Sequence, residues 1–496
     1  MRAGTLVRLS LAGNRTDRMR TALTAGSAAL GAVALLAAAT VASIHGGASI
    51  DAPTGLRTLS PGSDQYASAL LVEQGLRPGV IFALIMLALP VLALAGQCIR
   101  LGAPARDRRL AALRLAGATP GQTVVIAGAE TAAAGLLGSI AGFGVYLVLR
   151  VVLDRRNGDG KLLLPTDVRP NTLILIVALL IVPVLAGLIG LLLMRRVVIT
   201  PLGVVRRLRE DGPQPWPGVL IVLGLVLFAP RTLQKILHLA PEGGRLPDWL
   251  PLLLMGVGVL LVMIGVVAGT GWISYTAGRL LRRYGRGPVA LLSGARLMAD
   301  PWNGSRTIGA LLAAVVFGAG TLGLRADLAT DFAAQRRFDE LIDPASAALN
   351  SAQDTAFYFG AIRLVMVAVT IALVVAAGGV LVALAEGIVA RRRTFAAMTA
   401  GGVPQAKLGA TLFVVTFVPL LPALLLALVC GVSLMRSMRT EVVVTDDTLT
   451  LALPIPVPIG SLALLGAGAV LAMLLVVGAG MLVLRSSTDL EEMRAS

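Results

Sequence analysis

The apolar residues of this chain fall into long continuous runs, separated by short polar segments that are rich in arginine. Most runs approach the ~20 residues that a helix needs to cross about 30 Å of hydrocarbon. A membrane barrel would instead alternate apolar and polar residues along each strand. The pattern therefore predicts an all-α integral membrane protein with about ten transmembrane helices. We place the spans at residues 21–43, 79–99, 123–149, 172–194, 217–230, 250–273, 307–324, 358–384, 409–435 and 459–484.

Landmarks in the first part of the chain recur in the same order in the last part. The offset between copies is 285 to 288 positions: 20–21 recurs at 306–307, 108–118 at 393–403, and 200–206 at 488–494. A constant offset of this kind marks a duplicated unit of roughly 190 residues. It predicts two parallel four-span repeats at 1–210 and 291–496, joined by a two-span linker at 211–290. Two copies with the same orientation need an even number of crossings between them, so the short run at 217–230 must also span.

Composition excludes a soluble globular protein. The chain is 56% hydrophobic and only 14% charged, whereas a soluble domain carries about a quarter charged residues. The first run is too long for a signal peptide and has an internal counterpart at 307–324, so we expect it to be retained.

The distribution of charge orients the chain. With a cytoplasmic N-terminus, the inner segments hold 27 Lys and Arg against 15 in the outer segments, and Arg363 lies at the outer end of a span. This asymmetry is the positive-inside pattern. It predicts a multi-pass protein of a bacterial cytoplasmic (plasma) membrane with both termini in the cytoplasm. The net charge of +16 is then a consequence of topology, and no nucleic-acid partner is expected.

No catalytic or metal site is expected. The chain has no G-x-x-x-x-G-K-[ST] loop to hold phosphates, and its histidines and cysteines are isolated from other ligands: His45, His238, Cys98 and Cys430. We therefore expect no catalytic residues, no metal and no cofactor of its own.

A short amphipathic helix follows the second span. Leu110 and Leu113 share one helix face, while Arg108 and Arg109 point largely elsewhere. Gly117 then ends the helix before the third span begins. Such a helix suits docking into a groove of a soluble partner, although it could also rest on lipid headgroups.

The second copy repeats this helix after the eighth span. Phe395 and Met398 recreate the apolar pair, Arg393 stands where the first copy has Arg108, and Gly402 recreates the stop. Because the feature recurs in both copies, docking is the favoured interpretation.

Glu130 is the only acidic residue placed well inside a span. An ionised carboxylate is costly in lipid, so Glu130 should face another helix or a wet cavity. Either an interhelical hydrogen bond or a substrate contact would explain it.

The longest outer segments, 44–78 and 325–357, are about 35 residues each, which is too short for a large outer domain. Ala333–Ile342 is a plausible helix within the second of these segments.

The run 108–118 resembles the cytoplasmic signature of FtsX-like ABC transporter permeases, and 201–206 resembles the segment after the fourth span of that family. Members often carry an acidic residue after the leading arginines, where this chain has Arg109 and Thr394. The arrangement of four, two and four spans resembles the ten-span branch. The resemblance implies a permease subunit that is not itself an enzyme. Its partner would be a cytoplasmic ABC ATPase subunit, acting as a dimer, that binds the ATP.

Two functions remain open at this point. The first is the permease subunit of a transporter that exports or extracts a peptide, lipid or other amphiphilic substrate. The alternative is a mechanotransmission regulator, which transports nothing and conveys ATPase motion to an extracellular cell-wall hydrolase or a sensor kinase. The short outer segments argue mildly against the alternative. An ion-coupled transporter would need more intramembrane ionisable residues than Glu130.

Overall fold

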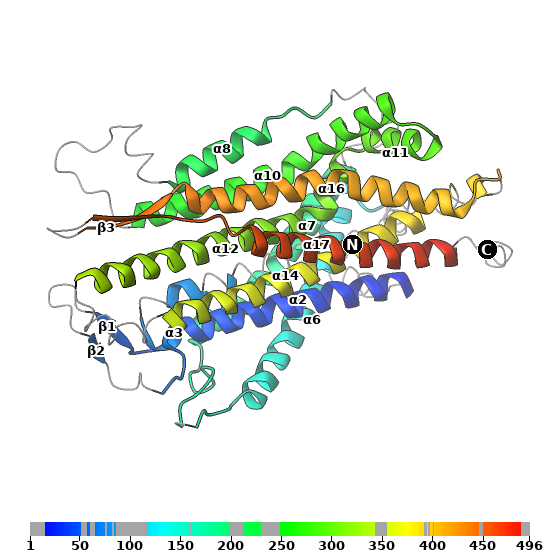
Figure 1. Cartoon of the computed structure of the whole chain (residues 1–496). Helices are drawn as coiled ribbons and strands as arrows, with labels where there is room; N and C mark the ends of the chain where they lie inside the picture. The colour runs from blue at the N-terminus through cyan, green and yellow to red at the C-terminus, as the bar shows by residue number, and fades with distance from the viewer. Residues whose placement is uncertain are drawn as a thin grey trace. The chain divides into compact units, whose positions relative to one another are not determined.

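The chain divides into two compact units, Met1–Arg209 and Glu210–Ser496, and each is described by itself. The structure is a computed structural model (Figure 1). It describes residues 15–50, 57–59, 65–74, 77–81, 84–85, 115, 117–158, 160–198, 212–229, 249–342, 355–390, 394, 397–399, 401–445 and 450–487.

The first unit is built around three long helices, α2 (Arg15–Ala42), α6 (Pro120–Val152) and α7 (Thr172–Val198). α6 packs against both α2 and α7. The outer segment between α2 and the second predicted span holds β1 (Ala48–Ile50), β2 (Arg57–Leu59) and the one-turn helix α3 (Ala69–Val72). β1 and β2 pair antiparallel, with Ser49 opposite Thr58.

Small residues set the close spacing of the three long helices. A Cβ on Gly138 would lie 2.6 Å from the Cβ of Ala28 in α2, and one on Gly135 would lie 3.0 Å from the Cα of Pro183 in α7. Small side chains let helix backbones approach in a membrane, where packing replaces the hydrophobic effect as the force between helices. α6 therefore presents one glycine-bearing face to each neighbour.

The second unit contains seven helices among the described residues, together with one β-hairpin. The helices are α8 (Pro217–Phe228), α10 (Trp249–Tyr284), α11 (Pro288–Ala299), α12 (Trp302–Ile342), α14 (Thr355–Ala390), α16 (Gln405–Arg436) and α17 (Ile459–Ser487), and the strands are β3 (Glu441–Thr445) and β4 (Thr450–Pro454). α12 packs against α14 and α16, and α14 packs against α17. α10 packs against α8, α11, α12 and α16.

The core of the second unit lies where α12 meets α16. Ala423 and Ala427 of α16 are fully buried, and Gly431 follows at the same four-residue spacing. A Cβ on Gly431 would lie 2.6 Å from the Cβ of Ala319 in α12. A stripe of small residues thus joins these two helices, as it joins α2 to α6.

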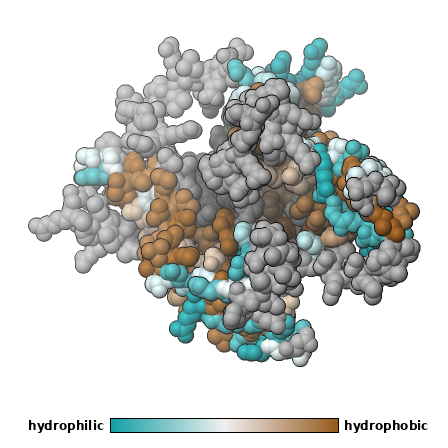
Figure 2. All heavy atoms as spheres, turned by 90° about the vertical axis from the view of Figure 1, so that its left-hand side faces the viewer, coloured by the Kyte–Doolittle hydropathy of each residue, from teal (hydrophilic) through white to brown (hydrophobic). Residues whose placement is uncertain are grey.

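The all-α membrane architecture predicted from the apolar runs is confirmed. Seven helices of the described residues are long and apolar enough to cross a membrane, and they coincide with seven predicted spans. α7 is a 27-residue helix over the predicted fourth span. α8 has only 12 residues, and 79–99 falls mostly outside the described residues, so these two spans stay predictions. Many large hydrophobic side chains on the long helices are exposed, as a lipid-facing surface requires; the end-on view of Figure 2 shows hydrophobic residues (brown) gathered in patches among the hydrophilic ones.

The structure adds three features to the predicted spans. α12 runs unbroken for 41 residues, so Ala333–Ile342 continues the span rather than forming a separate helix. α10 extends past the predicted end at residue 273 as far as Tyr284, and α11 follows as an additional short helix. The segment between α16 and α17 forms the hairpin β3–β4, paired from Glu441 opposite Pro454 to Thr445 opposite Thr450.

Candidate functional site

The turn between α14 and α16, which we predict to lie on the cytoplasmic side and call the second inner turn, contains a Schellman motif. The amide of Val403 donates to the carbonyl of Met398 at 3.0 Å, and the amide of Gly402 donates to Thr399 at 3.0 Å. Gly402 has φ 86°, the left-handed conformation that this motif places just after a helix. The glycine stop predicted at this position therefore has a definite hydrogen-bonding basis.

Met398 points into its own repeat. It packs with Val403 against a buried cluster of Ile388, Leu408 and Leu412. A hydrophobic contact between these two positions commonly accompanies a Schellman motif. Met398 thus joins the end of α14 to the start of α16, which gives it a structural role beside the docking role predicted for it.

The exposed face of the same short helix is formed by other residues. Thr394 and Ala397 are helical and exposed, while Met398 and Thr399 are half-buried. Thr394 and Ala397 are three residues apart and share one helix face. This face is open to a partner.

The first inner turn precedes α6 and has a different cap. Leu115 is helical and 92% exposed, and Gly117 has φ 93°. Thr119 then caps α6: its side chain accepts from the amide of Gln122, whose side chain accepts from the amide of Thr119. Leu115 is an apolar side chain almost wholly open to its surroundings, and it was not among the predicted coupling residues.

Both turns therefore place an exposed helix end before a glycine of positive φ, at Gly117 and Gly402. The other predicted coupling residues lie outside the described residues: Arg108, Arg109, Leu110, Leu113, Arg393 and Phe395.

Glu130 is half-buried on α6, one residue before Thr131, which donates to the carbonyl of Ala127 at 2.7 Å. Its predicted interhelical hydrogen bond stays a prediction.

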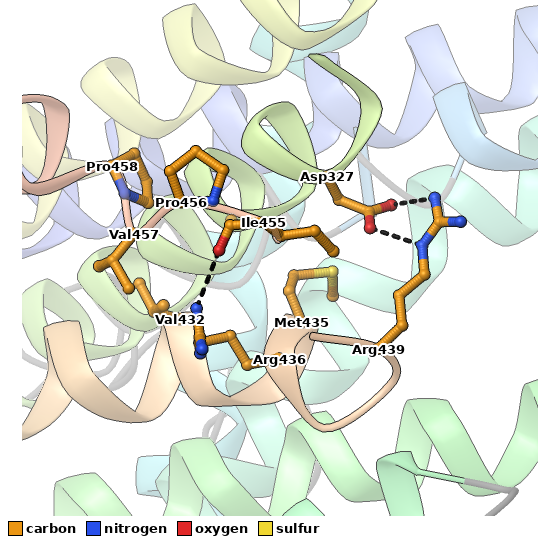
Figure 3. Close-up of a pocket in the computed structure, with 10 residues that line it drawn as sticks. Asp327, Val432, Met435, Arg436, Arg439, Ile455, Pro456, Val457 and Pro458 are labelled. Atoms are coloured by element: carbon orange, nitrogen blue, oxygen red, sulfur yellow. Dashed lines mark hydrogen bonds and ion pairs between the residues drawn. The ribbon is translucent and has the colours of Figure 1, made fainter. Parts of the chain in front are cut away.

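At the opposite end of the second unit, an ion-pair cluster fixes the β3–β4 hairpin to α12. The Arg439 guanidinium donates to both carboxylate oxygens of Asp327, at 2.6 and 2.9 Å, and contacts Asp331 at 3.1 Å. Figure 3 shows Asp327 and Arg439 facing each other beside Met435 and Ile455. The hydrogen bond to Asp327 raises the pKa of Arg439, so this cation stays charged.

An apolar contact lies beside the ion pairs. Ala334 of α12 packs with Val442 and Ile455 in a buried cluster, and Arg436 donates to the carbonyl of Ile455 at 3.2 Å. The pocket between these residues (Figure 3) has room for about one water molecule. It is therefore a structural joint, too small to hold a transported molecule. Because it lies at the end of the second unit that we predict to face outward, we call it the outer joint of the second unit.

The first unit has an outer joint of its own, centred on Arg77. This side chain is 7% exposed and donates to the carbonyls of Leu71, Ile44 and Val72 at 2.8, 3.0 and 3.3 Å. Burial lowers the pKa of Arg77. Hydrogen bonds to carbonyls compensate part of the cost of burying a charge, so Arg77 holds the segment after α2 against the start of the second predicted span.

Tyr66 connects this joint to the segment before α7. Its hydroxyl donates to Asp167 at 2.9 Å, and Gln65 donates to the same carboxylate at 2.6 Å. Burial, together with the Asp167 hydrogen bond, raises the pKa of Tyr66 from 10.0 to about 12. The two outer segments of the first unit thus fold together.

Comparison with protein families identifies two matching segments. The model described as FtsX-like permease C-terminal matches residues 80–202 and again residues 366–488. The chain belongs to the FtsX-like permease family. The two matches are 286 positions apart at both ends, which confirms the duplication predicted from the landmarks. No curated protein and no solved structure matches the chain.

The family assignment makes this protein an ABC-transporter permease component of a membrane, a class that is not itself enzymatic and typically partners with an ABC ATPase. In each repeat of the permease, the matched segment contains the last three predicted spans and the predicted inner turn between the first two of them. The leading helices α2 and α12 lie before the matches. Each match begins three residues after an arginine, Arg77 or Arg363.

These equivalent arginines have different surroundings. Arg77 is buried against carbonyls, whereas Arg363 is exposed, in keeping with its predicted position at the outer end of a span. The outer joint of the second repeat uses Arg439 instead. Neither joint could be predicted from the residues alone, because Asp327 and Arg439 are 112 positions apart and the hydrogen bonds of Arg77 among the described residues go to backbone carbonyls.

Proposed function

We propose that this chain is the permease subunit of an ABC transporter that exports or extracts a peptide, lipid or other amphiphilic substrate. ATP binding and hydrolysis take place on a separate cytoplasmic ATPase dimer, which docks on the two inner turns. The chain itself supplies no catalytic residue or cofactor. The membrane is the bacterial cytoplasmic membrane, with the termini and both turns on the cytoplasmic side.

The observation that carries this proposal is an exposed helical residue shortly before a glycine of positive φ in each family-matched segment: Leu115 lies two residues before Gly117, and Ala397 lies five residues before Gly402. Leu115 in the first turn is 92% exposed, and Ala397 is exposed in the second. A rigid cap follows each of them, at Thr119 and at Gly402. A push on either turn therefore passes directly into the third span of that repeat.

Copurification of the full chain with its ATPase tests the docking role. Leu115→Asp and Ala397→Asp place a carboxylate where an apolar groove would cover it, at a cost of several kcal/mol, on the order of a polar group buried without a partner. We expect either change to weaken the association severely. Val443→Asp is the matched control, because Val443 is 53% exposed on the outer hairpin and should leave copurification unchanged.

Met398→Ala separates docking from folding. Because Met398 is half-buried and packs against Ile388 and Leu408, its truncation should lower the free energy of unfolding by about 1–2 kcal/mol while leaving ATPase copurification of the folded protein intact. Normal ATPase copurification of Leu115→Asp, of Ala397→Asp and of the double variant would show that the turns are not the docking elements.

The regulatory alternative is favoured by one observation, the outer joint of the second unit. A hairpin held to α12 by ion pairs and an apolar cluster is suited to presenting motion to an extracellular partner such as a cell-wall hydrolase or a sensor kinase. ATPase activity that responds to such a partner, in vesicles that move no amphiphile, would select this alternative.

A further inference from the structure

The end of α10 and all of α11 form a helical hairpin, residues 272–299, that we call the basic elbow. α11 lies beside the end of α10 (Figure 1), and the two helices pack tightly. A Cβ on Gly278 would lie 3.0 Å from the carbonyl oxygen of Gly294, and one on Gly285 would lie 2.7 Å from the Cβ of Ala290. The pairing of these positions shows that the helices run antiparallel.

The charges of the elbow are all of one sign. Residues 274–299 contain five arginines and no aspartate or glutamate. Arg279, Arg282, Arg283 and Arg286 are exposed, and no carboxylate of the described residues pairs with them. Two of these arginines lie over aromatic rings: Arg279 is 6.0 Å from the centre of the Tyr275 ring, and Arg283 is 5.5 Å from that of Tyr284. Arg282 contacts the Met298 sulfur at 3.8 Å. Among the described residues, these four exposed arginines therefore form a positively charged surface without a carboxylate partner.

Exposed apolar and aromatic side chains lie among these arginines. Trp272, Leu280, Tyr284, Leu291 and Leu292 are each at least 41% exposed. A surface facing water would mix charges of both signs, and hydrocarbon would exclude unpaired arginines. Arginine together with Trp, Tyr and Leu is instead typical of a segment at the membrane–water interface.

The position along α10 agrees with this environment. The apolar run of α10 ends near Ile273, and Arg279 follows six residues later, about 9 Å along the helix axis. The polar headgroup region begins at the edge of the hydrocarbon and is roughly 5–8 Å deep. A long arginine side chain can reach back over the remaining distance.

We propose that the basic elbow binds anionic phospholipid headgroups, with Arg279 and Arg283 holding the phosphate. These two residues are four apart and share one face of α10. A guanidinium donates paired hydrogen bonds to phosphate oxygens. Leu291 and Leu292 of α11 then lie against the upper part of the acyl chains.

Bound lipid would act on an element next to the second inner turn. α11 contacts α16 as well as α10, and α16 begins at Gln405, directly after that turn. A headgroup that fixes the elbow therefore also fixes α11 against the helix that receives the turn. The lipid site stands independently of the proposed function, since it requires neither an ATPase nor a transported substrate.

The test measures phosphatidylglycerol binding to the full chain, purified in detergent free of anionic lipid, by native mass spectrometry. Wild type should bind phosphatidylglycerol in preference to phosphatidylcholine. Arg279→Gln with Arg283→Gln should lower the apparent affinity about tenfold, because each basic residue at an anionic surface adds to the attraction. Arg279→Lys with Arg283→Lys, which keeps both charges but not the paired donors, should lose less affinity than the glutamine pair.

The control removes two exposed arginines from the outer segment before α7, Arg155→Gln with Arg169→Gln, and should leave binding unchanged. Equal loss in the control and the elbow variant, or no preference for phosphatidylglycerol in wild type, would overturn the proposal. Competition by soluble glycerol phosphate at the lipid's own concentration would indicate a free-phosphate site instead. If the glutamine pair fails to fold, Leu291→Ser with Leu292→Ser, both at exposed positions, must weaken binding for the proposal to stand.

Discussion

At the scale of single residues, the two inner turns reach a similar shape by different hydrogen bonds. The first relies on the reciprocal bonds of Thr119 and Gln122, and the second relies on the Schellman bonds around Gly402. A glycine of positive φ accompanies each turn: Gly117 lies two residues before Thr119, and Gly402 lies within the Schellman motif. That glycine could be predicted from its place after an apolar pair, whereas the side on which Met398 packs could not.

Gly402→Ala should weaken the second turn by about 1 kcal/mol, the usual cost of a side chain in a left-handed conformation. The cost is conformational, because no atom lies within 4 Å of a Cβ built on Gly402. Gly401→Ala is the control: its Cβ would make an ordinary contact with the Ala397 carbonyl at 3.4 Å. Thermal melting of the purified chain distinguishes the two, and equal losses would contradict the role of φ.

Tyr66 makes the outer joint of the first unit sensitive to alkaline pH. Its pKa of about 12, against an ordinary 10.0, means that the folded joint keeps a proton that the unfolded joint loses in this range. Stability from Tyr66 is therefore fully present below pH 10.0 and declines as pH rises toward about 12. The difference in tyrosinate absorbance between wild type and Tyr66→Phe should have its titration midpoint near pH 12. A midpoint near pH 10.0 would show that the Tyr66 hydroxyl is not hydrogen-bonded to Asp167 in the folded protein.

Asp327→Asn should loosen the β3–β4 hairpin from α12. The change removes the carboxylate that accepts two hydrogen bonds from Arg439 and leaves the single contact with Asp331. Arg439 is 37% exposed, so we expect an effect of about 1 kcal/mol, smaller at high salt. Limited proteolysis within the hairpin measures it. Asp331→Asn should increase proteolysis less than Asp327→Asn does. If Asp331→Asn had the larger effect, Asp331 rather than Asp327 would be the main partner of Arg439.

At the scale of elements, small residues set the helix spacing in both units. Gly431→Val should force α16 away from α12, because even a Cβ there would lie 2.6 Å from the Ala319 Cβ. Overpacking of this kind costs about 1–3 kcal/mol. Gly378→Val on α14 is the matched control, since nothing lies within 4 Å of its Cβ. A melting temperature that falls equally in both variants would show that the α12–α16 contact is not unusually close.

Apolar runs of about 20 residues predict helices well, because a helix is the only open-chain structure that satisfies its backbone in lipid. The length of an apolar run does not predict how far its helix continues into the polar sequence beyond the membrane. α12 continues from its span to Ile342, and α10 continues to Tyr284, since a helix already begun extends at little cost. The β3–β4 hairpin depends on Ala334 and Asp327, which lie far away in the sequence, and could not be predicted locally.

At the scale of the whole molecule, the duplication was predictable from landmarks alone, because each landmark is a helix boundary that both copies share. The family match recovers the same offset of 286 positions. The parallel orientation predicted for the two repeats stays a prediction about how the units assemble.

Topology can be checked with single cysteines in a chain from which Cys98 and Cys430 have been removed. Glu340 and Ala397 are both exposed and belong to opposite ends of the second unit. With cytoplasmic termini, a membrane-impermeant maleimide should label Glu340→Cys in intact cells and reach Ala397→Cys only after permeabilisation. Labelling of Ala397→Cys in intact cells would invert the orientation and remove the cytoplasmic docking role from the turns.

The unbroken length of α12 makes it a lever. Its 41 residues measure about 60 Å, roughly twice the hydrocarbon thickness. The arm beyond Leu324 is about 27 Å long, at 1.5 Å per residue, so a tilt of about 10° carries its tip through roughly 5 Å. Arg439 and Ala334 hold the β3–β4 hairpin to this arm. A small tilt of α12 within the membrane would therefore move the hairpin by several ångströms outside the membrane.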